Sequence, residues 1–281
     1  MVYQDTKLKR SHNIFLHWCG FDQFIPEQIV TSYWISPKVL LLYRIICALY
    51  TGFIFWFFVI VFSFWPIDLW NIYFKFFTIY SYVGLHAYFV TTAIYEWRYI
   101  KSKSVNFLLH RKSFWNYTFM YLYSTVVCFN ILTPVIYWTL LSYLLPLDNF
   151  LSILFNVSFH ILAFLMMFFD VWFTRMRLPK RLVIFTTFTV FLYMIEAFID
   201  HAIQGTWVYP FMDWKQGFVA FLYYLYVGNV EVAAFFIMKA IHILRDRLAY
   251  KLGKAEAAVN FPEHRQREEH AELNTDITRM A

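Results

Sequence analysis

The chain has 281 residues, of which 60% are hydrophobic and 15% are charged, and its formal net charge is +6. So few polar residues cannot cover the surface of a soluble globular protein of this length, which excludes the soluble class and indicates an integral membrane protein. The basic residues lie mainly between apolar segments and in the tail. They form no compact basic face with interleaved aromatic residues, so nucleic acid is not an expected partner.

Six long apolar stretches predict transmembrane helices. Each reaches about 20 residues, the length that an α-helix needs to cross the roughly 30 Å hydrocarbon layer. In chain order, after a polar N-terminal arm (1–38), the stretches are 39–64, 76–95, 114–141, 150–172, 182–203 and 217–243, followed by a charged tail (244–281). The expected fold is an all-α integral membrane protein, a bundle of six transmembrane helices over residues 39–243.

Lysine and arginine residues gather in every second gap between these stretches. The arm, the second gap, the fourth gap and the tail are basic, whereas the first and third gaps hold almost no positive charge. By the positive-inside rule, both termini should face the cytoplasm, or the matrix in a mitochondrial membrane. Lys75 and Lys215 lie next to helix starts, where a long side chain reaches the interface. The expected location is the endoplasmic reticulum or the plasma membrane, and the mitochondrial inner membrane fits the same pattern.

Ionisable residues inside the apolar stretches are the first candidates for function, because hydrocarbon penalises a charge that lacks a partner or water. Each of them either fixes helix packing through a hydrogen bond or belongs to a site. They are His86, His160, Asp170, Glu196, Asp200, His201 and Glu231. The expected topology places Asp170 toward the cytoplasmic side and, in the outer half, Thr78, His160, Glu196, Asp200 and His201.

No metal or other cofactor is expected. A di-iron site in a helical bundle uses Glu-x-x-His pairs and desaturase-like enzymes use closely spaced histidines, and the sequence has neither pattern. A haem between His86 and His160 is compatible with their spacing, but nothing selects it. Transporters typically have broken helices at matching places in two repeated halves. Here Pro134 is the only proline deep in a predicted helix, so the sequence lacks this pattern.

Nucleophilic chemistry is the remaining enzymatic interpretation. The hydroxyl of Thr78 could attack a carbonyl if His160 accepted its proton, because a hydroxyl nucleophile needs an adjacent base. The alternative is structural, since an intramembrane threonine usually bonds to a carbonyl of its own helix.

Three motifs, in matching order, resemble those of the rolling-stone proteins and the related androgen-induced membrane proteins. The first is Lys75-Phe-Phe-Thr78, followed by Tyr88-Phe89. The second is Asn156-Val-Ser-Phe-His160 with Asp170 ten residues later. The third is Gly205-Thr-Trp-Val-Tyr-Pro-Phe-Met-Asp-Trp214. The resemblance spans roughly residues 38–250, and no single motif is specific by itself.

The resemblance implies a six-helix bundle with both ends cytoplasmic. In the androgen-induced branch it also implies hydrolysis of fatty acid esters of hydroxy fatty acids, with a threonine and a histidine that correspond to Thr78 and His160, and with His201 in support. This chain departs from the family pattern at Val157 and at Asp200-His201, where the family has additional histidines. The rolling-stone branch is linked to myoblast fusion.

Two hypotheses follow. The first is a non-catalytic membrane component, either an accessory subunit of a membrane complex or a fusion-related protein, suggested by the altered histidines, the aromatic content of 23% and the charged tail. The alternative is an intramembrane threonine hydrolase of lipid esters that uses Thr78 and His160. Membrane lipids are expected partners in both cases, and other membrane-protein subunits are expected partners in the first.

Overall fold

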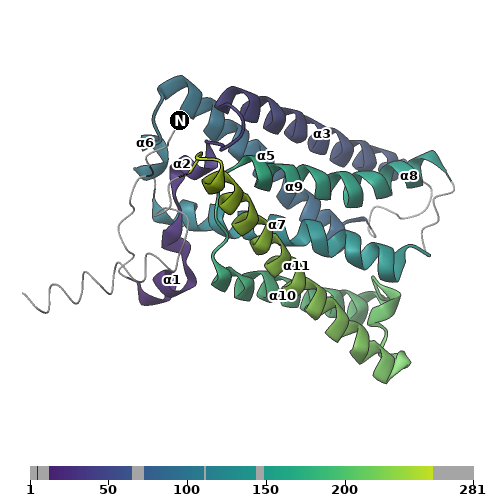
Figure 1. Cartoon of the computed structure of the whole chain (residues 1–281). Coiled ribbons are helices and arrows are strands. Elements are labelled where there is room, and N and C mark those ends of the chain that lie inside the picture. Colours follow the sequence, from purple (N-terminus) through teal and green to yellow (C-terminus); the bar gives the residue numbers. More distant parts are fainter. Residues whose placement is uncertain (1–4, 6–12, 65–72, 111, 144–148, 256–281) are drawn as a thin grey trace, which may run out of the picture.

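The computed structural model describes residue 5 and residues 13–64, 73–110, 112–143 and 149–255 (Figure 1). All regular structure in these residues is helical, as predicted. Six long helical segments form the bundle. They are α3 (Pro37–Ser63), α5 (Phe77–Ser102), α7 (Ser113–Ile136), α8 with α9 (Phe150–Asn156 and Ala163–Phe173), α10 (Val183–Gln204) and α11 (Phe218–Lys251).

Helix α5 differs from the other long segments. Within the described residues, five helices are long and apolar enough to cross a membrane, and α5 is not among them. It contains His86, Glu96 and several tyrosines, and it packs between α3 and α7. Protein covers many of its polar side chains there, among them Tyr82, Tyr88, Thr92 and Glu96. A helix enclosed in this way can carry polar residues that lipid would exclude. The prediction of an all-α multi-pass membrane protein is confirmed, and the prediction of six spans depends on α5.

Helix α7 lies at the centre of the bundle and α10 at its edge. Helix α7 contacts α5, α9, α10 and α11. Its apolar segment is 67% buried inside the protein, compared with 17% for α10. The side chains of α10 that point outward are mostly large and apolar, so most of this helix faces lipid or a partner.

Two of the long segments contain π-helical turns. Helix α7 continues as the π-helical segment Tyr137–Leu141, and α8 joins α9 through the π-helical segment Val157–Leu162. Pro134 precedes the first of these segments. Because proline has no N–H, it cannot donate to the carbonyl four residues earlier, and the regular hydrogen-bond ladder is interrupted near this point. Single π-helical turns occur often at functional sites.

Much of the arm that the sequence presents as polar packs against the bundle. Helices α1 (Ile14–Cys19) and α2 (Pro26–Ile29) lie at one end of the molecule (Figure 1). Ile29 and Val30 are fully buried in the main core. Between the two helices, Gly20 has a φ of 86°, and an added Cβ would lie 2.9 Å from Cβ of Pro179. Only glycine fits there without strain, and the close contact joins the N-terminal segment to the loop before α10.

The N-terminal segment and the end of α11 lie at the same end of the bundle (Figure 1). The Nζ atom of Lys254 is 5.1 Å from the centre of the Trp34 ring. Helix α11 has 34 residues, which at 1.5 Å per residue gives about 50 Å, longer than the hydrocarbon layer. The tail predicted from residue 244 therefore begins as helix, with Arg245 fully buried. Residues 256–281 of that tail, and most of the first and third gaps, lie outside the described residues.

Candidate functional site

A buried charge cluster joins three long helices at the end of the bundle where the N-terminal segment packs. The Arg44 guanidinium of α3 lies 2.8 Å from a carboxylate oxygen of Glu96 in α5 and 3.0 Å from one of Asp170 in α9, and all three side chains are fully buried. Tyr88 donates a hydrogen bond of 2.6 Å to the other oxygen of Asp170. We call these four residues the Arg44 cluster.

The Arg44 cluster also holds the N-terminal segment, because Arg44 Nη1 donates to the carbonyl of Ile29 at 2.8 Å. Two of its polar atoms, Arg44 Nη2 and Glu96 Oε1, have no hydrogen-bond partner in the described residues. A buried ion pair contributes little net stability compared with apolar packing, but removal of one partner leaves an uncompensated charge at a cost of about 3–5 kcal/mol. The cluster therefore links α3, α5 and α9 through contacts that are costly to break.

Sequence reasoning selected Asp170 and missed Arg44 and Glu96. Arg44 lies just inside the apolar stretch 39–64, and Glu96 directly follows the stretch 76–95. All three are close to the basic ends of their helices. One arginine and two acids at similar expected depth in three helices are the signal that could have identified this cluster.

His86 and Glu231 also make contacts between helices. The Thr51 hydroxyl of α3 lies 2.9 Å from Nδ1 of His86. Thr187 of α10 donates to Glu231 of α11 at 2.6 Å, and the Cys128 thiol of α7 lies 3.6 Å from the same carboxylate. The structure thus places three of the predicted residues, His86, Asp170 and Glu231, in separate contacts that each connect different helices.

Thr78 and His160 are not joined by a hydrogen bond. Thr78 lies in the first turn of α5, where the preceding backbone N–H of Phe77 donates to the hydroxyl of Tyr209 at 3.0 Å. His160 lies in the π-helical segment Val157–Leu162, and its ring stacks on Tyr137, with 4.2 Å between centres and 10° between planes. Its Nδ1 atom is buried and has no hydrogen-bond partner among the residues that the structure describes. A catalytic pair would need a hydroxyl proton within reach of this ring, and the pairing stays a prediction.

His201 belongs to a different group of residues at the far end of α10. Its ring stacks on Trp207 with 3.7 Å between centres. One residue earlier, Asp200 forms an ion pair of 3.0 Å with Lys75, so this lysine is partnered by protein. Among the described residues, no three histidine, cysteine or acidic side chains converge where they could hold a metal ion.

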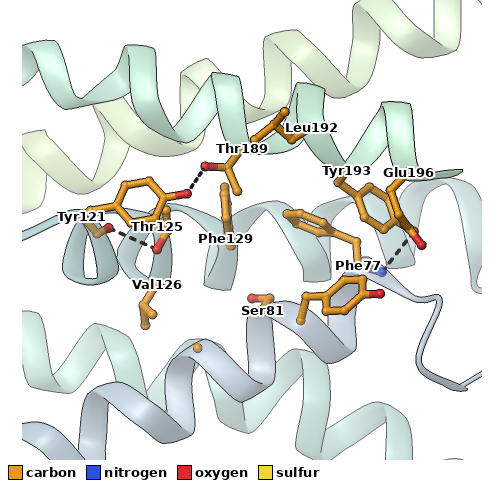
Figure 2. Close-up of a pocket in the computed structure, with 12 residues that line it drawn as sticks. Phe77, Ser81, Tyr121, Thr125, Val126, Phe129, Thr189, Leu192, Tyr193 and Glu196 are labelled. Carbon is orange, nitrogen blue, oxygen red and sulfur yellow. Dashed lines mark hydrogen bonds between the residues drawn. The ribbon is translucent and has the colours of Figure 1, made fainter. Parts of the chain in front are cut away.

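A pocket of about 360 Å³ lies between α5, α7 and α10 (Figure 2). Its volume falls at the lower end of the range typical of ligand sites, about 300–1,000 Å³. Glu196 is the one predicted site residue in its lining, which also includes Phe77, Tyr80, Ser81, Gly84, Tyr121, Thr125, Val126, Phe129, Thr189, Leu192 and Tyr193. The pocket is thus mainly aromatic and aliphatic, with one carboxylate and several hydroxyls.

Hydrogen bonds hold the polar groups of this pocket in place. Tyr193 donates to the carbonyl of Lys75 at 2.8 Å and accepts from the backbone N–H of Phe77 at 3.2 Å. Across the pocket, the hydroxyls of Tyr121 and Thr189 are 2.5 Å apart (Figure 2). Glu196 differs, because its Oε2 atom is shielded from solvent and has no hydrogen-bond partner in the described residues.

The sequence indicated Glu196 as a candidate site residue, but it did not predict the other residues that line the pocket. The tyrosines and threonines that complete the pocket lie in three helices and have no distinctive spacing. No protein family, curated protein or solved structure that was compared matches the chain. The resemblance to the rolling-stone and androgen-induced proteins therefore stays a prediction.

Proposed function

We propose that this protein is a non-catalytic component of a membrane assembly, with six spans and both termini on the cytoplasmic or matrix side. Five apolar helices support the multi-pass architecture. Helix α5, with 26 residues, is long enough to be the sixth span, since about 20 residues suffice. The packing of the N-terminal segment near the end of α11 supports a common side for both termini.

The observation that carries the proposal is that three of the ionisable residues in the apolar segments connect helices. His86, Asp170 and Glu231 each bond to a side chain of another helix. A catalytic acid or base must instead have a free lone pair or proton directed at substrate. Residues already bound to their neighbours in this way favour a scaffold over a reaction centre.

An apolar stripe on α10 supports an accessory role. Ile184, Phe188, Phe191, Ile195 and Ile199 are exposed large side chains at spacings of three or four residues, so they lie along one face of the helix. Only 17% of the apolar segment of α10 is buried inside the protein. In a complex, this stripe is the face that another membrane helix would cover.

The experiment is purification in a mild detergent, followed by native electrophoresis and mass spectrometry of stoichiometric partners. The variant Phe188→Ala with Ile195→Ala removes bulk from the stripe and should release the partner. The matched control is Phe53→Ala with Ile46→Ala, which makes the same two changes seven residues apart on the exposed face of α3. A wild-type protein that migrates as a monomer without partners would overturn the proposal.

The second candidate function is hydrolysis of a lipid ester by Thr78 and His160. The observation that favours it is the stacked pair of Tyr137 and His160, which come from the two π-helical segments. Within the described part of the chain, Nδ1 of the histidine has no hydrogen-bond partner. In this reaction His160 would take the proton of the Thr78 hydroxyl as it attacked the ester carbonyl, and would pass that proton to the departing alcohol. The acyl group would then be an ester of Thr78, and water would hydrolyse it to release the acid and restore the hydroxyl. A fluorophosphonate probe should label the wild type and neither Thr78→Ala nor His160→Ala. Absence of labelling in folded wild-type protein would reject this function.

A further inference from the structure

The pocket between α5, α7 and α10 lies beside a group of three charged side chains. On α10, Glu196 and Asp200 are four residues apart and therefore lie on the same face. Lys75 is bound to Asp200 at 3.0 Å. The three charged groups together leave one net negative charge. Glu196 is one of the residues that line the pocket, and its Oε2 atom accepts no hydrogen bond in the described residues.

Glu196 lies deep enough in the membrane-spanning helix that its negative charge needs stabilisation. It lies eight residues before the end of α10, which corresponds to about 12 Å along the helix. At that depth an isolated carboxylate is costly, and a cation or a hydrogen-bond donor stabilises it. The residues that line the pocket include no lysine, arginine or histidine. Lys75 acts electrostatically on Glu196 but is bound to Asp200.

The pocket has the length and direction of a short apolar channel. On α10 it runs from Glu196 to Thr189, and on α5 from Phe77 to Gly84. Seven residues at 1.5 Å per residue make each wall roughly 10 Å long. Its rim includes Tyr80 and Leu192, which are 47% and 48% exposed, so it opens sideways between α5 and α10. In a membrane, a molecule would enter from the lipid phase.

We propose that this pocket binds a single-chain lipid amine, with its ammonium group on Glu196 and its hydrocarbon chain along Phe77, Phe129 and Val126. The ammonium matches the one negative charge by which Glu196 and Asp200 together exceed Lys75, since a charged hydrogen bond between an ammonium and a carboxylate is strong. The chain matches the aromatic and aliphatic wall. A fatty acid would bring a third carboxylate beside those of Glu196 and Asp200. A phospholipid amine would bring a phosphate to the same place. Charge complementarity therefore selects the amine without a phosphate. This proposal does not depend on the proposed function.

The test uses the purified full-length chain in detergent and a photoreactive long-chain amine that carries an alkyne tag. The matched probes are the alcohol and the carboxylic acid with the same chain. Crosslinked peptides from α5, α7 and α10 are then quantified. The amine should label these peptides about tenfold more than the acid. An ethanolamine lysophospholipid should compete poorly, and competition equal to that of the free amine would overturn the proposal.

Two variants locate the bound probe. An added Cβ at Gly84 would be 3.6 Å from Val126 and 3.9 Å from Leu122, an ordinary contact, so Gly84→Leu should fold and fill the pocket. Gly228→Leu is the control, because a Cβ at Gly228 would meet nothing within 4 Å. Labelling by the amine should be lost only in Gly84→Leu. Labelling that persists in this variant would identify a nonspecific surface adduct and overturn the proposal.

A third variant tests the chemistry of recognition. Glu196→Gln removes the charge but keeps the shape, so labelling by the amine should fall to the level of the alcohol. Thermal unfolding and size-exclusion profiles like those of the wild type would show that the variant is folded. Equal labelling of the wild type by amine and alcohol, unchanged in Glu196→Gln, would show that a neutral ligand is bound and would overturn the assignment of an amine.

Discussion

The Arg44 guanidinium and the Asp170 carboxylate, which are 126 positions apart in the chain, meet at 3.0 Å with fully buried side chains. This contact joins α3 to α9, and Glu96 adds α5 to the same guanidinium at 2.8 Å. In a membrane, apolar contact between helices gives little preference for one neighbour over another, because lipid is equally apolar. A buried pair of opposite charges supplies that preference.

We expect Asp170→Asn to lower the free energy of unfolding by about 3–5 kcal/mol, because it removes the charge that faces Arg44 and weakens the bond from Tyr88. The free energy of unfolding is measured in mixtures of mild detergent and SDS, with tryptophan fluorescence as the signal. As a control, Asp213→Asn changes a capping carboxylate outside the bundle and should cost about 1 kcal/mol or less. Equal effects of the two variants would show that the Arg44 cluster does not fix the helices.

The apolar stretches and the positions of the basic residues predicted the helical class and most helix positions. Length and composition suffice for this, because a helix must satisfy its own backbone in lipid. The contacts between helices were not predictable in the same way. Glu196 and Asp170 both stood out as acids in apolar segments, yet one lines a pocket and the other is bound to Arg44. Their surroundings depend on helix rotation and stagger, which the sequence pattern does not determine.

The N-terminal segment shows a second limit of the sequence pattern. Its charges and prolines indicated a polar arm, and they gave no sign that Ile29 and Val30 would pack in the core. A short helix of four residues has too few positions to reveal an apolar face by periodicity. Its packing depends instead on tertiary contacts such as the bond from Arg44 to the carbonyl of Ile29.

Gly52 and His86 form a tight contact between α3 and α5. An added Cβ at Gly52 would lie 2.9 Å from Cε1 of His86, so Gly52→Ala should displace the imidazole and weaken its bond with Thr51. We expect a loss of about 1–3 kcal/mol in the wild-type background. In a His86→Ala background the cost of Gly52→Ala should be much smaller. A double-mutant cycle of unfolding free energies measures this coupling.

Gly228→Ala provides the reference for this cycle. A Cβ at Gly228 would meet nothing within 4 Å. Alanine should therefore stabilise α11 slightly, by roughly 0.5–1 kcal/mol, through its higher helix propensity. If Gly52→Ala and Gly228→Ala had the same effect, close packing against His86 would not be the reason for glycine at position 52.

Tyr209, in the segment between α10 and α11, gives a pH-dependent prediction. Burial raises the pKa of its phenol to about 12. In the unfolded chain the pKa is about 10, so the unfolded state loses its proton first as the pH rises. The contribution of Tyr209 to stability is therefore complete below pH 10 and is lost between pH 10 and 12. The Tyr209→Phe variant should lack this pH-dependent contribution to the free energy of unfolding.

Thermal unfolding of the wild type and Tyr209→Phe, compared at pH 9 and pH 11, checks this sign. At pH 9 the wild type should be more stable by about 1 kcal/mol, because its phenol accepts the backbone N–H of Phe77 at 3.0 Å. At pH 11 the advantage should shrink or reverse. A constant difference across this range would mean that the folded state does not protect the phenol from ionisation.

The topology can be tested with two introduced cysteines. Ser102 ends α5, and Gln216 precedes α11; both are exposed. The proposed six spans place Ser102 on the cytoplasmic side and Gln216 on the opposite side. In sealed vesicles with the cytoplasmic face outward, an impermeant maleimide should label Ser102→Cys at once and Gln216→Cys only after detergent is added. The native cysteines, Cys19, Cys47 and Cys128, are buried and should give low background.

This pair of positions tests the three spans that follow α5, because the number of spans between residues 102 and 216 determines their relative sides. Helices α7, α8 with α9, and α10 lie between them, and three crossings put the two cysteines on opposite faces. A third cysteine at Ser63, the last residue of α3, completes the test. If α5 crosses the membrane, Ser63→Cys should be protected like Gln216→Cys. If α5 did not cross the membrane, Ser63→Cys and Ser102→Cys would lie on the same side. The two variants would then show the same labelling before detergent is added.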